Sequence, residues 1–406
     1  MEKISLTLLL FICSLCGALA QYRYDQVAYH TIYIEDLPQA LKKTPHHLLL
    51  DVRSPGEYHD TSSFHGLNIG RLKGSRNISI REIDKRLAEI KEYKDQAVYL
   101  YCSHSQRSRR VGKMLADSGF TNVANVNGGM TEFHLLKTKK KKLNALFEKN
   151  SYFDLVAPET ACQLIRTNKE LAIIDVRPDS AYMGITKDVI LNAFGKLKGS
   201  LHMPLEQLKN SMGSIPKSTP ILLVDSYGNE SEIAATYLHE LGYQHIQVLF
   251  NGLEAWMTSD HFKGKDEIWI QSNRYGLISS IEFDHRMQLT PPPFILDVRT
   301  SAEYTNRDTV MSFHNRGHIQ GAVNIPVQEL KERILEISQY KKTEVIVYTL
   351  FDNPEAFEAA KILTDEGFTR VNVLSGGLWN LRWTAANLKG LSHMTNLVVD
   401  VPVENR

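Results

Sequence analysis

Residues 48–58 read LLLDVRSPGEY, and closely similar text occurs twice more in the chain. It returns as AIIDVRPDSAY at 172–182 and as FILDVRTSAEY at 294–304, so the copies start 124 and 122 residues apart. A repeat of this length is too long for a solenoid unit and is typical of independent domains. The 406-residue chain is therefore predicted to hold three copies of one domain.

Two further markers keep the same register. A second apolar run ends at Cys102 in the first copy, at Asp225 in the second and at Thr349 in the third. A pair of small residues completes each copy 27 or 28 residues later, namely Gly128-Gly129, Asn251-Gly252 and Gly376-Gly377. Three markers in constant register are hard to obtain by chance, so they strengthen the prediction of a triplicated domain.

Composition limits the class of protein. The chain carries 47 Lys and Arg against 46 Asp and Glu, a net charge of +1. It therefore lacks the excess of positive charge that is typical of nucleic-acid-binding proteins. Its 43% hydrophobic and 23% charged residues are typical of a folded chain with sizeable cores. Four cysteines in 406 residues exclude a disulfide-stapled scaffold.

The first 20 residues have the pattern of a secretory signal peptide. Lys3 is followed by an apolar run over 8–15, and small residues precede Gln21. The run is shorter than the roughly 20 residues that span a bilayer. We expect cleavage after Ala20, no stable membrane span, and export to the periplasm or secretion.

Strands and helices alternate within each copy. In the first copy, apolar runs over 48–52, 97–101 and 122–126 indicate buried strands, and the helical spacing of Val111, Met114, Leu115 and Ser118 indicates a helix that ends before Gly119. This alternation predicts an α/β fold with a parallel, helix-covered sheet. Ligands bind beyond the carboxyl ends of strands in such sheets, and Cys102 lies at a strand end.

Domain boundaries follow from the markers and from linker-like segments. A basic run over 137–142 separates the first copy from the second and predicts a solvated linker. Three prolines at 291–293 stiffen the entry to the third copy's first strand. We place the signal peptide and the three domains at 1–20, 21–136, 150–262 and 270–388.

The segment after Cys102 carries the candidate chemistry. Small polar residues and an arginine lead into the predicted helix, in the order Ser103, His104, Ser105, Gln106, Arg107 and Ser108. Such a loop can direct backbone N–H groups and a helix N-terminus at the sulfur. With Arg107 nearby, we predict that the pKa of Cys102 falls below its usual value of about 8.5. The thiolate that results is the nucleophilic form.

These motifs resemble those of the rhodanese superfamily. The resemblance rests on Asp51-Val52-Arg53, Glu57-Tyr58, residues 74–78, residues 102–108 and Gly128-Gly129, and it extends over nearly the whole mature chain. It implies three tandem rhodanese-like domains, each with a mainly parallel five-stranded sheet flanked by helices.

The same resemblance implies a sulfurtransferase. In this family the loop cysteine accepts sulfane sulfur from a donor such as thiosulfate, polysulfide or a persulfide, and passes it to a thiol or a cyanide-like acceptor. Cys102 would carry the sulfur as a persulfide, and residues 103–108 would form the anion-binding loop. No cofactor is implied, and the scattered histidines form no metal-binding pattern.

The loop departs from the family at two positions. Ser105 stands where many members have glycine, and Ser103 stands where thiosulfate-specific members have lysine or arginine. The second departure weakens thiosulfate as the physiological donor. Four residues separate Cys102 from Arg107, whereas phosphatases and the phosphatase relatives of rhodaneses have five. The shorter loop favours sulfur transfer over phosphatase chemistry.

The second and third copies lack a thiol in the loop. Asp225 and Thr349 occupy the cysteine position, and Glu230 and Pro354 occupy the arginine position. A carboxylate cannot carry sulfane sulfur, and a threonine is a nucleophile only beside a base. We predict that both copies are inert in sulfur transfer, and they could instead bind a protein partner.

Two alternative hypotheses stay open. The chain could be a non-catalytic scaffold, because two of its three copies lack the thiol. It could also be a thiol redox protein that pairs Cys102 with Cys162. We interpret Asp51, Arg53 and Glu57 as a structural motif, since the aspartate recurs in the inert copies, and we expect Arg53 to pair with Glu57.

Overall fold

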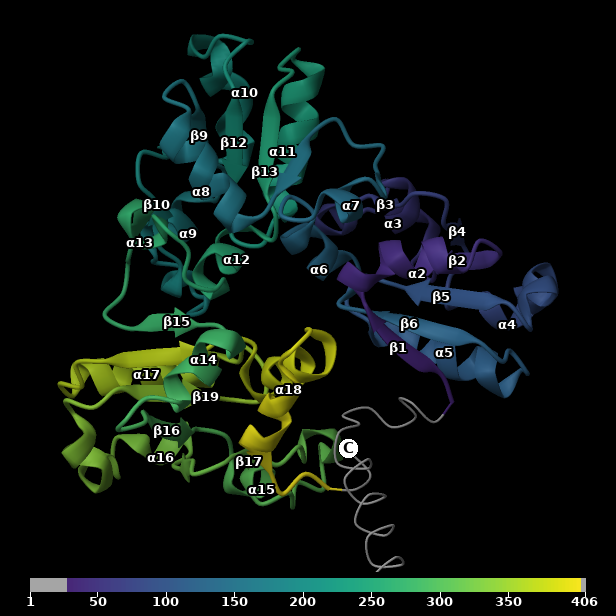
Figure 1. Ribbon diagram of the computed structural model, residues 1–406. Coiled ribbons are helices and arrows are strands. Elements are labelled where there is room, and N and C mark those ends of the chain that lie inside the picture. The colour runs from purple at the N-terminus through teal and green to yellow at the C-terminus, as the bar shows by residue number, and fades with distance from the viewer. Residues whose placement is uncertain (1–27, 403–406) are drawn as a thin grey trace, which may run out of the picture.

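The computed structural model describes residues 28–402, which form three lobes, one for each copy of the repeat (Figure 1). The predicted signal peptide lies outside the described residues. Over the described part of the chain, no helix combines the length and apolar character needed to span a bilayer.

The first domain contains a five-stranded parallel sheet in the order β1-β6-β5-β2-β4. Its strands are β1 (His30–Tyr33), β2 (His47–Asp51), β4 (Arg76–Asn77), β5 (Ala97–Tyr101) and β6 (Val123–Asn127). Its main helices are α2 (Leu37–Lys43), α3 (Pro55–His59), α5 (Gln106–Asp117) and α6 (Gly129–Leu136). Every residue of β5 and β6 is buried, as expected of inner strands covered on both faces.

The second domain repeats this sheet in the order β8-β13-β12-β9-β11. Its strands are β8 (Asp154–Val156), β9 (Ala172–Asp175), β11 (Leu201–His202), β12 (Ile221–Val224) and β13 (Ile246–Leu249). Its main helices are α8 (Pro158–Thr167), α9 (Asp179–Met183), α11 (Asn229–Glu240) and α12 (Gly252–Thr258).

The third domain has the order β15-β20-β19-β16-β18. Its strands are β15 (Gly276–Ile278), β16 (Phe294–Asp297), β18 (Val323–Asn324), β19 (Val345–Tyr348) and β20 (Val371–Leu374). Its main helices are α14 (Ser280–Met287), α15 (Ser301–Tyr304), α17 (Pro354–Asp365) and α18 (Gly377–Asn387). The predicted fold class, three tandem α/β domains with parallel five-stranded sheets, is confirmed.

A short antiparallel ribbon ties each domain to the chain that follows its last sheet strand. The ribbons pair β3 (Arg71–Leu72) with β7 (Phe147–Glu148), β10 (Lys196–Leu197) with β14 (Trp269–Ile270), and β17 (His318–Ile319) with β21 (Val398–Val399). In the first domain, α7 (Lys141–Asn144) leads into β7. Lys137 is buried there, with its Nζ 4.2 Å from the centre of the Phe147 ring. Only part of the basic run 137–142 is therefore solvated.

The repeated DVR text forms the same buried ion pair in every domain. The pairs are Arg53–Asp51, Arg177–Asp175 and Arg299–Asp297, with Nη2–Oδ2 distances of 2.7, 2.6 and 2.6 Å. Each arginine also donates to a backbone carbonyl oxygen, that of Gly70, Gly195 or Gly317. The pair therefore fixes the strand end to the loop ahead of the ribbon in all three domains.

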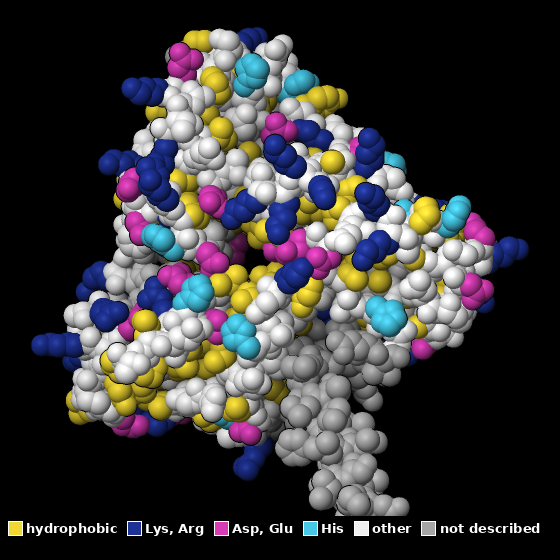
Figure 2. Space-filling model, in the orientation of Figure 1, with side chains coloured by type: hydrophobic (Ala, Val, Ile, Leu, Met, Phe, Trp, Pro, Cys, Tyr) yellow, Lys and Arg dark blue, Asp and Glu magenta, His cyan; other side chains and the backbone are white. Residues whose placement is uncertain are grey.

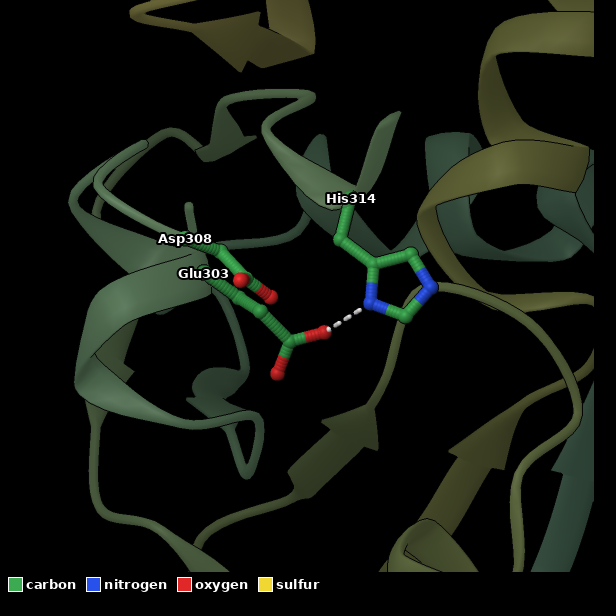
Figure 3. A group of neighbouring side chains, drawn as sticks. All are labelled: Glu303, Asp308 and His314. Carbon is green, nitrogen blue, oxygen red and sulfur yellow. Dashed lines mark ion pairs between the residues drawn. The ribbon is translucent and has the colours of Figure 1, made fainter. Parts of the chain in front are cut away.

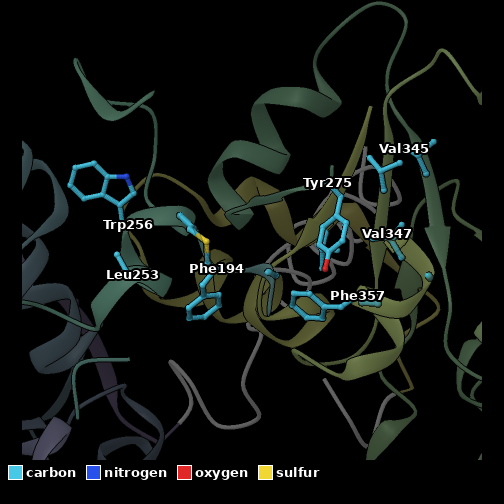
Figure 4. Close-up of a cluster of buried hydrophobic side chains, with 14 of the residues drawn as sticks. Phe194, Leu253, Trp256, Tyr275, Val345, Val347 and Phe357 are labelled. Atoms are coloured by element: carbon cyan, nitrogen blue, oxygen red, sulfur yellow. The ribbon is translucent and has the colours of Figure 1, made fainter. Parts of the chain in front are cut away.

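Apolar clusters cross the boundaries between domains. One cluster joins domains 1 and 2 and includes Phe133 of domain 1 and Phe250 of domain 2. Beside it, the ring of His134 in domain 1 stacks on that of Phe250, with the centroids 4.7 Å apart. Another joins domains 2 and 3 and includes Trp256 and Phe357 (Figure 4). The three domains therefore pack on one another.

Acidic side chains gather beside the hollow between the three lobes on the face shown in Figure 2. An acidic group of one domain here changes the pKa of an acidic group in another domain. Burial and the charge of Asp352 in domain 3 raise the pKa of Glu254 in domain 2 to about 7.

Candidate active site

The cysteine loop connects β5 to α5 through a residue of unusual conformation. Ser105, directly before α5, has φ 71° and ψ −17°. Its hydroxyl oxygen accepts the N–H of Gly128 at 2.8 Å. This left-handed region favours glycine, and Gly228 with φ 91° occupies the equivalent position in domain 2. The loop in domain 1 therefore combines a strained backbone with a side-chain hydrogen bond.

The glycine pair after β6 allows a close backbone approach to the loop. Gly129 has φ 56°, and a Cβ atom there would lie 2.3 Å from the carbonyl oxygen of Cys102. The N–H of Met130 donates to that same oxygen, and the N–H of Thr131 donates to the carbonyl oxygen of Ser103, each at 3.0 Å. The third sequence marker thus anchors the cysteine loop.

The thiol of Cys102 lies between an apolar cluster and a polar helix end. The residue is only 1% exposed and packs with the core of domain 1. From the first turns of α5, Ser108 Oγ donates to Sγ at 3.6 Å. The sulfur is therefore almost fully screened from solvent in this conformation.

Domain 2 shows where the backbone amides of such a loop point. Asp225, at the cysteine position, accepts the N–H of Gly228 at 2.5 Å and the N–H of Ser231 at 3.0 Å. The equivalent amides in domain 1 belong to Ser105 and Ser108. In domain 2 the loop therefore directs two amides at the side chain that follows the strand, as in other anion-binding turns.

Arg107 forms a two-pronged ion pair with Glu57, and both Nη–Oε distances are 2.7 Å. Its Nη2 also donates to Ser103 Oγ at 2.6 Å. Burial alone would raise the pKa of Glu57, but hydrogen bonds from Arg107 and Ser54 outweigh burial and lower the pKa to about 2. The expectation that Glu57 pairs with Arg53 is therefore wrong, because its partner is the loop arginine 50 residues away.

Domain 3 contacts the outer side of the loop. Trp383 on α18 donates its indole N–H to the carbonyl oxygen of His104 at 2.9 Å. Close by, Asn127 Nδ2 donates to the carbonyl oxygen of Ala386 at 3.0 Å. The sequence analysis missed Trp383, because no local pattern marks a contact between domains.

The predicted site residues differ in their exposure. The buried ones are Cys102, Ser103, Ser105 and Ser108, together with Asp51, Arg53 and Glu57. Arg107 is partly exposed, whereas His104 and Gln106 are exposed. Of the buried residues, Ser108 contacts the sulfur, and the exposed ones lie on the outer surface of the loop.

The second cysteine lies in a different domain. Cys162 is buried on α8, and its thiol donates to the carbonyl oxygen of Lys263 at 3.6 Å. Burial raises the pKa of Cys162. Cys102 and Cys162, the two cysteines of the described residues, are free thiols and belong to separate apolar clusters. This arrangement does not favour a redox pair.

The equivalent loops of domains 2 and 3 hold other groups. Burial and the neighbouring Glu230 raise the pKa of Asp225 to about 7. In domain 3, Thr349 Oγ1 donates to the carbonyl oxygen of Phe351 at 2.7 Å, and Pro354 begins α17 where domain 1 has its arginine. Neither loop presents a thiol.

A family model, the rhodanese-like domain, matches the chain at 34–136, 158–259 and 282–382. The chain therefore belongs to the rhodanese family, as its motifs predicted. The uncharacterized protein YqhL of Bacillus subtilis is 31% identical over 136 residues, which are 33% of this chain and 97% of that protein. The thiosulfate sulfurtransferase GlpE of Pseudomonas paraeruginosa is 27% identical over 106 residues, 26% of this chain and 86% of that enzyme.

Solved structures resemble the chain more distantly. Wild-type EanB shares 17% identity with a TM-score of 0.29, covering 88% of this chain and 97% of that one. A thiosulfate sulfurtransferase from Pseudomonas aeruginosa shares 16% identity with a TM-score of 0.22, covering 85% of this chain and 66% of that one. The named relatives thus include sulfurtransferases.

Proposed function

We propose that domain 1 moves sulfane sulfur through a persulfide on Cys102. The surroundings of the thiol support this most strongly. The sulfur lies at a strand end and a helix N-terminus, 3.6 Å from Ser108 Oγ, in a loop whose counterpart in domain 2 directs two amides at the same position. Such donors stabilise a thiolate or a persulfide anion.

The transfer would take two balanced steps. The Cys102 thiolate attacks the outer sulfur of the donor, a new S–S bond forms, and the rest of the donor leaves with the electrons of the old bond, as sulfite from thiosulfate. An acceptor thiolate or cyanide then attacks the outer sulfur of the persulfide and restores the Cys102 thiolate. The steps need no external oxidant or reductant, and therefore no redox cofactor.

Arg107 acts in this scheme as a positioning residue. Both of its Nη atoms bind the buried carboxylate of Glu57, and Nη2 also binds Ser103 Oγ. These bonds fasten the first turn of α5 and the start of the loop to α3. They hold the donors around the sulfur while the charge of the arginine is largely balanced by that of the glutamate.

The setting of the reaction belongs to the same proposal. The signal-like segment 1–20 supports export to the periplasm or secretion. The donor would be thiosulfate, polysulfide or a persulfide, and the acceptor a thiol or a cyanide-like anion. Because domains 2 and 3 lack the thiol, we assign them a supporting role, which includes binding of a protein partner.

The test is direct. Residues 21–406 are incubated with thiosulfate or polysulfide, and peptides are analysed by mass spectrometry. We expect one added sulfur atom on Cys102, and its transfer to added cyanide as thiocyanate. Cys162→Ser is the matched control and should behave as the parent chain.

Three outcomes would contradict the proposal. Turnover that survives Cys102→Ser refutes the persulfide route. Absence of labelling by every donor favours the non-catalytic scaffold. A peptide in which Cys102 is disulfide-linked to Cys162 in a non-reducing digest favours the redox protein.

A further inference from the structure

Domain 3 has a cavity where domain 1 has its cysteine loop. The cavity has a volume of about 250 Å³ and lies beyond the carboxyl ends of β16 and β19, next to Arg299 and Thr349. Carboxylates from Glu303, Asp308 and Glu355 line it together with the ring of His314. The guanidinium of Arg299 also borders the cavity, where it is bound to Asp297 at 2.6 Å and, among the described lining residues, is the one cationic side chain beside the three carboxylates.

Domain 3 has no arginine at the position of Arg107, so Glu303 in this cavity lacks the guanidinium partner that Glu57 has in domain 1. Glu303 caps α15 through Thr300, as Glu57 caps α3 through Ser54 in domain 1. The position of Arg107 is taken by Pro354, and Glu303 Oε1 instead lies 2.8 Å from Nδ1 of His314. An imidazole, which is a metal ligand, has thus replaced a guanidinium, which is not.

Asp308 completes a group of three ligands (Figure 3). One ligand atom from each of Glu303, Asp308 and His314 lies within 4.8 Å of the other two. The side chains of Glu303 and His314 are only 13% and 21% exposed. Glu355, which also lines the cavity, has a buried oxygen, Oε2, without a hydrogen-bond partner among the described residues. The cavity therefore holds excess negative charge that a cation would balance.

Hydrogen bonds hold both carboxylates in place. Glu303 Oε2 accepts the N–H and the hydroxyl of Thr300, at 3.1 and 2.9 Å. Asp308 Oδ1 accepts the N–H groups of Val310 and Met311, both at 2.9 Å. In metal sites, bonds of this kind orient the ligands and leave the second oxygen for the ion.

We infer that Glu303, Asp308 and His314 bind one divalent transition-metal ion, with zinc the best match. Imidazole with carboxylates suits zinc, whose ligands lie about 2.1 Å away. Two such ligands are about 3.0–3.4 Å apart, so the 2.8 Å separation of Glu303 and His314 needs to open by only a few tenths of an ångström. His314 would bind through Nδ1 and carry its proton on Nε2.

The test uses tag-free chain 21–406, freed of metal with a chelator and titrated with Zn²⁺ by calorimetry. We expect one strong site per chain, and an X-ray absorption spectrum at the zinc edge with an imidazole signal. His314→Gln should remove that signal, and His314→Gln and Asp308→Asn should each weaken binding at least about tenfold. Asp308→Asn keeps the oxygen that accepts the two loop amides, which protects the fold.

His393→Gln is the matched control. His393 Nε2 also lies 2.8 Å from a carboxylate in domain 3, that of Asp284. Among the described residues, only the Glu303 group brings three such ligands together. Unchanged binding by His393→Gln supports the inference. The inference is overturned if the parent chain binds no zinc, if both site variants bind as well as the parent, or if His393→Gln weakens binding as much as they do.

Discussion

Trp383 in domain 3 donates its indole N–H to the carbonyl oxygen of His104 in the cysteine loop of domain 1, at 2.9 Å. The two residues are 279 positions apart in the chain. The bond therefore joins α18 of domain 3, which has no thiol, to the loop of domain 1. That loop carries Cys102, the only cysteine at this position in the three copies. Since Cys102 is 1% exposed, we expect access to the sulfur to depend on how firmly this loop is held.

Removal of the indole should loosen the cysteine loop. We expect Trp383→Ala to increase the rate of Cys102 alkylation by iodoacetamide about fivefold, the effect of losing one hydrogen bond of about 1 kcal/mol. The rate is measured on the Cys102 peptide by mass spectrometry. Trp379→Ala, on the same helix but packed against Phe351 within domain 3, should leave the rate unchanged. Equal rates in all three chains would show that α18 does not hold the loop.

The Glu57–Arg107 pair should make domain 1 sensitive to acid. The pKa of Glu57 is lowered from 4.5 to about 2 in the fold, so between these values the unfolded chain binds a proton that the folded chain does not. The free energy of unfolding therefore falls as the pH drops from about 5 toward 2. Glu57→Gln should cost about 2 kcal/mol at pH 7 and show a smaller decrease in acid.

Hydrogen exchange of the β5 amides, corrected for the intrinsic exchange rate, measures this stability at pH 5 and pH 3. Arg107→Gln is a second probe, because it leaves the buried carboxylate of Glu57 without its cation and should cost more, about 3 kcal/mol. Parallel pH profiles for the parent chain and Glu57→Gln would contradict the assignment.

Two substitutions of Ser105 separate backbone strain from hydrogen bonding. Ser105→Ala keeps φ 71° and leaves the buried N–H of Gly128 without its acceptor, so it should cost about 2 kcal/mol. Ser105→Gly loses the same bond but relieves about 1 kcal/mol of left-handed strain. Exchange of the β6 amides should therefore rank the glycine variant above the alanine variant, and the reverse order would refute the argument.

Asp225 should make domain 2 less stable as the pH rises. Its pKa is raised from 3.8 to about 7, so between these values the folded domain holds a proton that the unfolded chain has lost. The free energy of unfolding then falls by up to about 1 kcal/mol for each pH unit and levels off above pH 7. Asp225→Asn should reduce this slope, measured by exchange of the β12 amides from pH 5 to 8, and the remainder should come from other buried carboxyl groups of the domain such as Glu254. A flat profile in the parent chain would contradict the shift.

Features that repeat along the chain could be predicted from the sequence. The run 97–101 coincides with β5, and the helix predicted from the spacing over 111–118 corresponds to α5 at Gln106–Asp117. The strand leaves a continuous apolar run because all of its residues are buried, and the helix leaves apolar residues at helical spacing because one of its faces is buried. The place of Cys102 at a strand end follows from the same pattern and agrees with the structure.

Contacts between distant segments could not be predicted. Arg53 has a carboxylate four residues ahead, yet it pairs with Asp51, and Glu57 reaches Arg107 on another element. The metal-ligand group of domain 3 also escaped notice, because its spacing over 303–314 matches no known motif and the fold alone brings the ligands together. A choice among several charged neighbours depends on the folded geometry, which local spacing does not encode.

The stacking of His134 on Phe250 has a consequence for shortened versions of this gene. A fragment that stopped after β7 would lack the second-domain half of the shared apolar cluster, including the Phe250 ring that covers His134. Exposed hydrophobic patches of that kind promote aggregation. We therefore expect the domains without a loop thiol to contribute to the solubility of domain 1 by covering its apolar surface.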